Sequence, residues 1–191
     1  MKNLYLRSCV ALLCATSLAA CGGGSGSLLV GGTVGGLTKT GLVLTNNGGP
    51  DLAIASGASS FSFPQLIDTD ANFNVQIKTQ PSGAVCTMVA GTNTGRASFN
   101  ITSVQVACVT NAYALGGSVT GRSAGLVLVN APDQLSIKAN GAFVFGAKVA
   151  DGAPYVVRIF TPPSSGSQCS ILNGEGRMGT ADINNVQVTC P

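Results

Sequence analysis

The chain contains no histidine and no tryptophan, and charged residues make up only 9% of its 191 residues. The absence of histidine excludes Ser-His-Asp triads, Cys-His pairs and most catalytic zinc sites. Ten basic residues stand against seven acidic ones. No basic face able to neutralise several phosphates is visible, so we do not expect nucleic-acid binding.

The first residues have the pattern of an export signal. Lys2 and Arg7 precede the apolar run 8–20, which is too short to span a bilayer and ends in Leu18-Ala19-Ala20-Cys21. This pattern resembles a bacterial lipoprotein signal with its lipobox. The resemblance implies that residues 1–20 are removed and that Cys21 becomes an acylated, palmitate-bearing first residue with a practically permanent hold on the membrane. A plain secretory signal and an uncleaved anchor are the alternatives.

The residue after the predicted cleavage site bears on the destination of the chain. Gly22 follows Cys21, which is similar to outer-membrane lipoproteins in the enterobacterial sorting pattern, so we expect a bacterial outer membrane protein facing the periplasm or the cell surface. Residues 21–28 form a Gly/Ser tether with an average span of roughly 15 Å, which keeps the following domain near the membrane. Removal of Lys2 and Arg7 leaves eight basic residues against seven acidic ones, so the mature chain is nearly neutral.

The rest of the chain is largely one module written twice. Residues 41–44 (GLVL) return at 125–128, and residues 104–106 (VQV) return at 186–188. The period of about 82 to 84 residues is too long for a solenoid unit and long enough for a small domain with its own core. We therefore expect two domains, at residues 29–109 and 113–191, joined by a short linker.

The cysteine pattern agrees with export and with the repeat. Four cysteines remain when those of the leader and Cys21 are set aside: Cys86, Cys108, Cys169 and Cys190. Four cysteines allow three pairings, but each copy of the repeat holds two, so we predict Cys86–Cys108 and Cys169–Cys190. An oxidising compartment lets such bonds persist, and each should stabilise its domain by about 3 kcal/mol. A metal site is disfavoured because no histidine or CxxC spacing accompanies these thiols.

Apolar and polar residues alternate in both copies, over residues 73–79 and 155–161, which predicts half-buried strands. In the last strand of each copy the alternation slips by one residue, so we predict β-bulges at Thr102-Ser103 and Asn184-Asn185. Turn signals such as Asn47-Gly48 separate the strands. No helix of useful length is expected.

About seven short strands per copy favour an antiparallel two-sheet sandwich. The strand order is a glycine-rich strand, GLVL, a short strand near Leu52 or Leu135, Phe-x-Phe, and a strand that opens with Phe73 or Tyr155. It resembles the immunoglobulin-like and prealbumin-like repeats of bacterial lipoproteins and surface proteins. The resemblance implies an all-β fold with two tandem, disulfide-stapled sandwich domains. The sequence departs from the isopeptide-bonded collagen-adhesin type, because the first copy contains no glutamate.

The acidic residues offer little basis for catalysis. Asp68 and Asp70 are the only close pair, and their counterparts in the second copy are not acidic, so a solvated loop is favoured over the paired carboxylates of a hydrolase. The same stretch begins like a calcium loop, but Phe73 and Thr79 stand where the turn glycine and the bidentate glutamate belong. A different, weak calcium site at Asp68 and Asp70 stays open.

Two further patterns are interpreted as structural. Residues 174–179 match the GxGxxG spelling of a dinucleotide turn, but a strand rather than a helix is expected to follow, so we predict no cofactor. Phe61, Phe63, Phe143 and Phe145 alternate in strand phase in both copies, which favours core positions over a glycan-stacking platform. An exposed Tyr113 or Tyr155 on a concave face would favour carbohydrate binding.

These observations predict a non-enzymatic, lipid-anchored envelope protein that acts as a structural spacer or a protein-interaction module. Its partners would be the membrane, through Cys21, and an envelope protein or surface ligand. The alternative is an adhesin-like binder of a glycan or host ligand.

Overall fold

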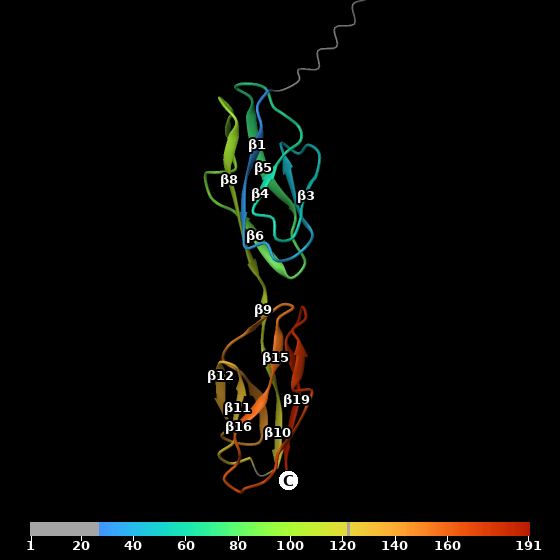
Figure 1. Ribbon diagram of the computed structural model, residues 1–191, viewed down its shortest axis with the longest axis vertical. Helices are drawn as coiled ribbons and strands as arrows, with labels where there is room; N and C mark the ends of the chain where they lie inside the picture. The colour runs from blue at the N-terminus through green and yellow to red at the C-terminus, as the bar shows by residue number, and fades with distance from the viewer. Residues whose placement is uncertain (1–26, 122) are drawn as a thin grey trace, which may run out of the picture.

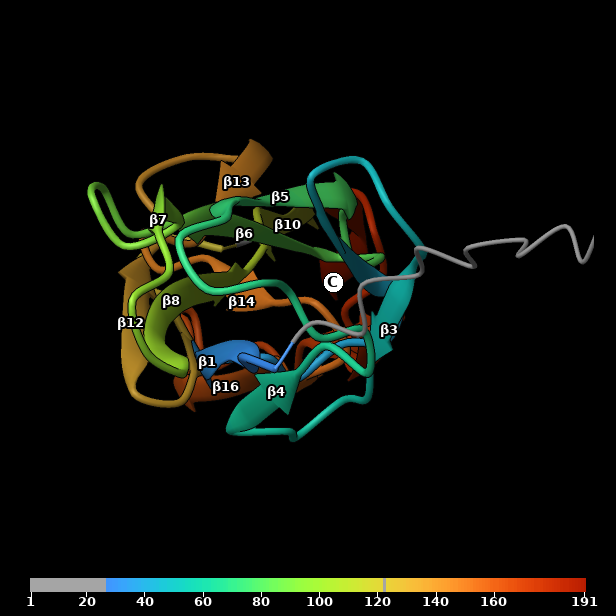
Figure 2. The ribbon, with the colours of Figure 1, turned by 90° about the horizontal axis from the view of Figure 1, so that it is seen from above.

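The computed structural model describes residues 27–121 and 123–191, so the predicted signal peptide, Cys21 and most of the tether lie outside the described residues. Every regular element within them is a β-strand, and none of their segments is a helix long and apolar enough to cross a membrane. Buried side chains form two separate cores, one from residues 30–108 and one from residues 115–190. The two halves lie end to end along the long axis (Figure 1) and overlap when viewed down that axis (Figure 2).

The first half is a β-sandwich-like pair of sheets. Its strands are β1 (Val30–Gly35), β2 (Leu42–Asn46), β3 (Leu52–Ile54), β4 (Ser60–Ser62), β5 (Asn72–Thr79), β6 (Ala84–Met88), β7 (Thr94–Arg96) and β8 (Ile101–Thr110). One sheet has the order β4-β1-β8-β6 and the other β3-β2-β5-β7. Val30 and Val104 from the first sheet and Leu44 and Val75 from the second are fully buried in one core. The predicted alternation of β5 is confirmed, because Phe73 and Val75 are buried.

Over the described residues, the second half repeats this arrangement in eleven strands, against eight in the first half. They are β9 (Ala112–Tyr113), β10 (Leu115–Gly121), β11 (Val127–Asn130), β12 (Asp133–Ser136), β13 (Gly141–Val144), β14 (Val149–Ala150), β15 (Pro154–Val156), β16 (Arg158–Thr161), β17 (Ser170–Leu172), β18 (Glu175–Arg177) and β19 (Ile183–Cys190). The sheet β13-β10-β19-β17 corresponds to β4-β1-β8-β6. The counterpart of β5 is interrupted at Val157, whose N–H bonds the carbonyl of Gly174.

Apart from the two-residue strand β9, the first and last strands of each half are parallel neighbours, β1 with β8 and β10 with β19. The expectation of purely antiparallel sandwiches is therefore wrong at this position. The alternation of apolar and polar residues reports which face of a sheet is buried and carries no information on strand direction. Because the first and last strands run the same way, the chain enters each half at one end and leaves it at the other, which places the halves end to end.

The predicted bulges are confirmed in both last strands. Val30 lies opposite Ile101, but Gly32 lies opposite Val104, so β8 has one extra residue at Thr102-Ser103. The second half repeats the shift, with the extra residue at Asn184-Asn185.

The glycine-rich start of each module is explained by close strand approach. A Cβ atom built on Gly32 would lie 1.8 Å from the carbonyl oxygen of Val104, and one built on Gly117 would lie 1.8 Å from that of Val186. Real Cβ atoms cannot come that close to an oxygen. Glycine at these two positions therefore permits the parallel pairing.

The disulfides Cys86–Cys108 and Cys169–Cys190 are the predicted ones. Cys86 and Cys108 are register partners on β6 and β8 of the same sheet, with 3.9 Å between their Cα atoms. Cys169 precedes β17 and bonds the last residue of β19. Each disulfide therefore fastens an edge strand to the closing strand of its half.

Candidate functional site

The predicted acidic pair lies on an exposed turn before β5. The carbonyl of Asp68 accepts a hydrogen bond from Ala71, and Asp70 has a φ angle of 66°. Arg96 Nε donates to the Asp70 carbonyl (2.9 Å) and lies 3.4 Å from its carboxylate. The described residues contain no group of three or more His, Cys, Asp or Glu side chains that could hold a metal ion. The turn gives Asp70 a cationic partner on the paired strand.

The second half has the same turn at residues 150–153, with Gly152 (φ 78°) in the place of Asp70. Arg177 donates to the Gly152 carbonyl, as Arg96 does to that of Asp70. The turn is thus a structural part of both modules, and the two aspartates of the first copy occupy positions that the second copy fills with other residues.

The aromatic residues are mostly core. Exposure is at most 9% for the four phenylalanines Phe61, Phe63, Phe143 and Phe145. The rings of Phe61 and Phe63 pack edge to face with 5.9 Å between their centroids, and those of Phe143 and Phe145 do the same. Tyr155 is buried and Tyr113 is half-buried. The four phenylalanines therefore stabilise the sandwiches and do not form an exposed stacking surface.

The GxGxxG stretch belongs to a two-stranded ladder. Gly176 lies on β18 opposite Tyr155 on β15, and a Cβ atom at Gly176 would lie 3.1 Å from ring atoms of Tyr155. Gly95 has the same relation to Phe73 in the first half. Both glycines leave room for the aromatic ring of the paired strand, a purely structural use of glycine.

The strongest polar cluster in the described chain is at the junction between the halves. Lys39 Nζ lies 2.6 Å from Asp151 Oδ1 and donates to the Asp151 carbonyl at 2.9 Å. The side chains of Lys39 and Asp151 are only 22% and 11% exposed. The backbone of Asn111, which separates β8 from β9, receives a hydrogen bond from Asp151 N–H and donates one to the Gly83 carbonyl. Elements of both halves therefore meet at one turn.

The junction leaves no room for a side chain at Gly83. Its φ angle is 76°, and a Cβ atom there would lie 2.3 Å from Asp151 Oδ2. The turn that ends β5 and starts β6 thus leaves space for the carboxylate of the other half. The junction is a specific fit of residues distant in sequence.

This cluster was not predicted from the sequence, although a signal was present. Lys39 and Asp151 are charged in one copy only. Ser82 N–H bonds the carbonyl of Thr40 in the first half, and Ser164 N–H bonds that of Ala124 in the second. Thr40 therefore corresponds to Ala124, and the preceding residue Lys39 corresponds to Ser123. In the turns before β5 and β15, Asp70 corresponds to Gly152, so the preceding residue Thr69 corresponds to Asp151. In a chain this poor in charge, a lysine and an aspartate outside the repeat pattern are candidates for a contact between the copies.

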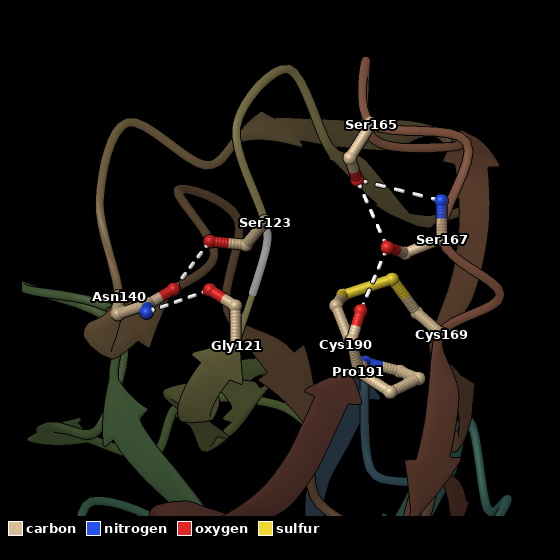
Figure 3. The surroundings of a disulfide bond; sticks show 8 residues. All are labelled: Gly121, Ser123, Asn140, Ser165, Ser167, Cys169, Cys190 and Pro191. Carbon is tan, nitrogen blue, oxygen red and sulfur yellow. Dashed lines mark hydrogen bonds between the residues drawn. A yellow bond between two sulfur atoms is a disulfide. The ribbon is translucent and has the colours of Figure 1, made fainter.

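The far end of the second half, opposite the junction, has a different hydrogen-bond network (Figure 3). The Ser123 hydroxyl donates to Asn140 Oδ1, and Asn140 Nδ2 donates to the Gly121 carbonyl. Next to the disulfide, the Ser167 hydroxyl donates to the Pro191 carbonyl at 2.7 Å. All of these hydrogen bonds join residues of the second half, unlike the Lys39–Asp151 contact, which joins the two halves.

Comparison of the chain with models of known protein families found no match, and comparison with curated proteins found none either.

Proposed function

We propose that this protein is a non-enzymatic, lipid-anchored component of the bacterial cell envelope that acts as a structural spacer or protein-interaction module. Cys21 would hold it in the outer membrane, facing the periplasm or the cell surface. We further propose that each half is an immunoglobulin-like or prealbumin-like domain. The sheet order, with the first strand parallel to the last, supports this assignment.

The observation that carries the proposal is the joint between the halves. A chain that enters each half at one end and leaves at the other extends away from its anchor. The Lys39–Asp151 pair, with the hydrogen bonds of Asn111, limits bending between the halves. A stiff pair of modules on a short tether holds its far end at a set distance from the membrane.

The experiment is recovery of partners from the native envelope. The lipidated chain carries a tag after Pro191, and a Cys21→Ser chain serves as the unanchored control. We expect the mass of the N-terminal peptide to show acylated Cys21, and we expect an envelope partner that is recovered in proportion to the tagged chain and is lost in Cys21→Ser.

Other outcomes would replace the proposal. A reproducible hydrolase or transferase activity that Asp68→Asn or Asp70→Asn abolishes would make the protein an enzyme. Specific binding on a glycan array, together with cleavage of the chain by protease on intact cells, would favour the adhesin-like alternative.

A further inference from the structure

In the first half a side chain covers the outer edge of the disulfide-bearing sheet at Cys86. Gln80 Oε1 accepts a hydrogen bond from Cys86 N–H at 2.8 Å, and Gln80 Nε2 donates to the Cys86 carbonyl at 2.9 Å. The amide of Gln80 therefore pairs with edge strand β6 as the backbone of another strand would. In the second copy Pro162 stands at the position of Gln80, and proline has no side-chain amide to cover the edge.

The strand register identifies the backbone groups that this change leaves uncovered. Because Cys86 bonds Gln80 on its outer side, Cys86 and Cys108 form a non-hydrogen-bonded pair of the ladder, and such pairs alternate with bonded ones. Cys169 is the counterpart of Cys86, and Ile171 lies two residues further along. The N–H and C=O groups of Cys169 and Ile171 thus point away from β19. Among the described strands β17 pairs with β19 alone, and no loop backbone group is bonded to Cys169 or Ile171 in the part of the chain that the structure describes.

The space beside this edge is open. A hollow of about 290 Å³ lies between β17 and the interruption at Val157, and Ile171 and Leu172 line it. Leu172 is 60% exposed. Arg158 and Glu175 line the same hollow, and neither is in an ion pair with another described residue. The edge therefore combines unpaired backbone, an exposed apolar side chain and one charge of each sign.

We propose that β17 pairs antiparallel with β17 of a second copy of this chain, with the two Ser170 residues opposite each other. In this register Cys169 of each copy lies opposite Ile171 of the other, so the uncovered N–H and C=O groups of both strands are satisfied. The contact is two-fold symmetric and joins two sheets into one, which removes an exposed edge.

Charge favours a second copy over another extended chain. A hollow lined by Arg158 and Glu175 carries one charge of each sign, so a second copy of the chain brings an opposite charge for each of them. A strongly charged partner would leave one of these groups facing a like charge. The pairing lies beyond the spacer function and does not depend on it.

The test is photo-crosslinking of the full-length chain in bacterial cells that express two differently tagged copies. The photoreactive residue p-benzoylphenylalanine replaces Leu172, which flanks the pairing, or Val89, which lies three residues beyond the covered Cys86 as Leu172 lies three residues beyond Cys169. We expect a crosslinked homodimer that carries both tags from the Leu172 position and none from Val89.

A second pair of variants tests the register. Ser170→Lys places two ammonium groups opposite each other and should lower the yield of crosslinked dimer about tenfold. Thr87→Lys, at the same position of the first half, should leave the yield unchanged. Both side chains are exposed, and formation of the Cys169–Cys190 disulfide on a non-reducing gel shows that the variant has folded.

Four results would overturn the proposal: no homodimer, equal yields from both labelled positions, a crosslink to a different protein, or a dimer that persists in Ser170→Lys.

Discussion

The ammonium group of Lys39 and the carboxylate of Asp151 meet at 2.6 Å across the two halves of the chain, 112 positions apart in sequence. Each half has its own core and its own disulfide. The halves are therefore able to hold their folds separately, and this contact, with the bonds of Asn111, couples them. The stiffness of the joint depends on a few named atoms.

Asp151→Asn should loosen the joint without unfolding either half. The amide keeps the size of the side chain but removes the charge opposite a mostly buried ammonium, which should cost about 1 to 2 kcal/mol. NMR relaxation should then show two halves that tumble with separate correlation times. The control is Asp51→Asn, which breaks the Lys78–Asp51 pair at 2.7 Å, where both side chains are about half exposed. That change should cost about 0.5 kcal/mol or less and leave the tumbling unchanged. Equal effects of the two variants would contradict the role of the joint.

Gly83→Ala should open the same joint by steric means. The new Cβ atom would collide with Asp151 Oδ2, and the positive φ angle adds backbone strain of about 1 to 2 kcal/mol. Gly57→Ala is the matched control, because Gly57 has a φ angle of 80° but nothing within 4 Å of its Cβ position. Small-angle scattering should show a broader range of shapes for Gly83→Ala alone, although both variants lose similar stability from strain. An unchanged scattering profile would show that the carboxylate moves aside.

The local features of the fold could be predicted from the sequence. The slip between Ile101 and Val104 predicted the bulge, because a bulge leaves the buried face unchanged while adding one residue. The burial of Phe61 and Phe63 was predicted from their alternation with polar residues, because residues two apart in a strand lie on the same face of the sheet. The repeat selected the disulfide pairing, since each module must close on itself.

The remaining features depend on relations that periodicity does not encode. The parallel pairing of β1 with β8 could not be predicted, because the alternation of apolar and polar residues is the same for either strand direction. The Lys39–Asp151 pair joins two loops at the ends of different modules. The hydrogen bonds from the Gln80 amide to the backbone of Cys86 are made by a side chain that reaches a strand edge, which periodicity does not predict. The corresponding Pro162 has no amide side chain to make them in the second half.

Gly117→Ala should severely destabilise the second half. A Cβ atom there would overlap the Val186 carbonyl, which is backbone held by the parallel ladder, so β10 and β19 must separate. We expect a loss of about 3 kcal/mol or more in urea unfolding. Gly35→Ala in β1 is the control, because its nearest atom would be 4.0 Å away. That substitution should change the free energy of unfolding by less than about 1 kcal/mol. Similar losses in both variants would contradict the explanation from close approach.

Removal of one disulfide should affect one half only. The double variant Cys169→Ala/Cys190→Ala removes the covalent link at the start of the β17–β19 ladder and opens a loop with a sequence separation of 21 residues, which should cost about 3 kcal/mol on the chain-entropy estimate. Because the cores are separate, calorimetry should show the melting transition of the second half shifted down while that of the first half stays in place. Cys86→Ala/Cys108→Ala should give the converse result. If either double variant shifted both transitions equally, the halves would unfold as one unit, and the Lys39–Asp151 joint would transmit stability as well as orientation.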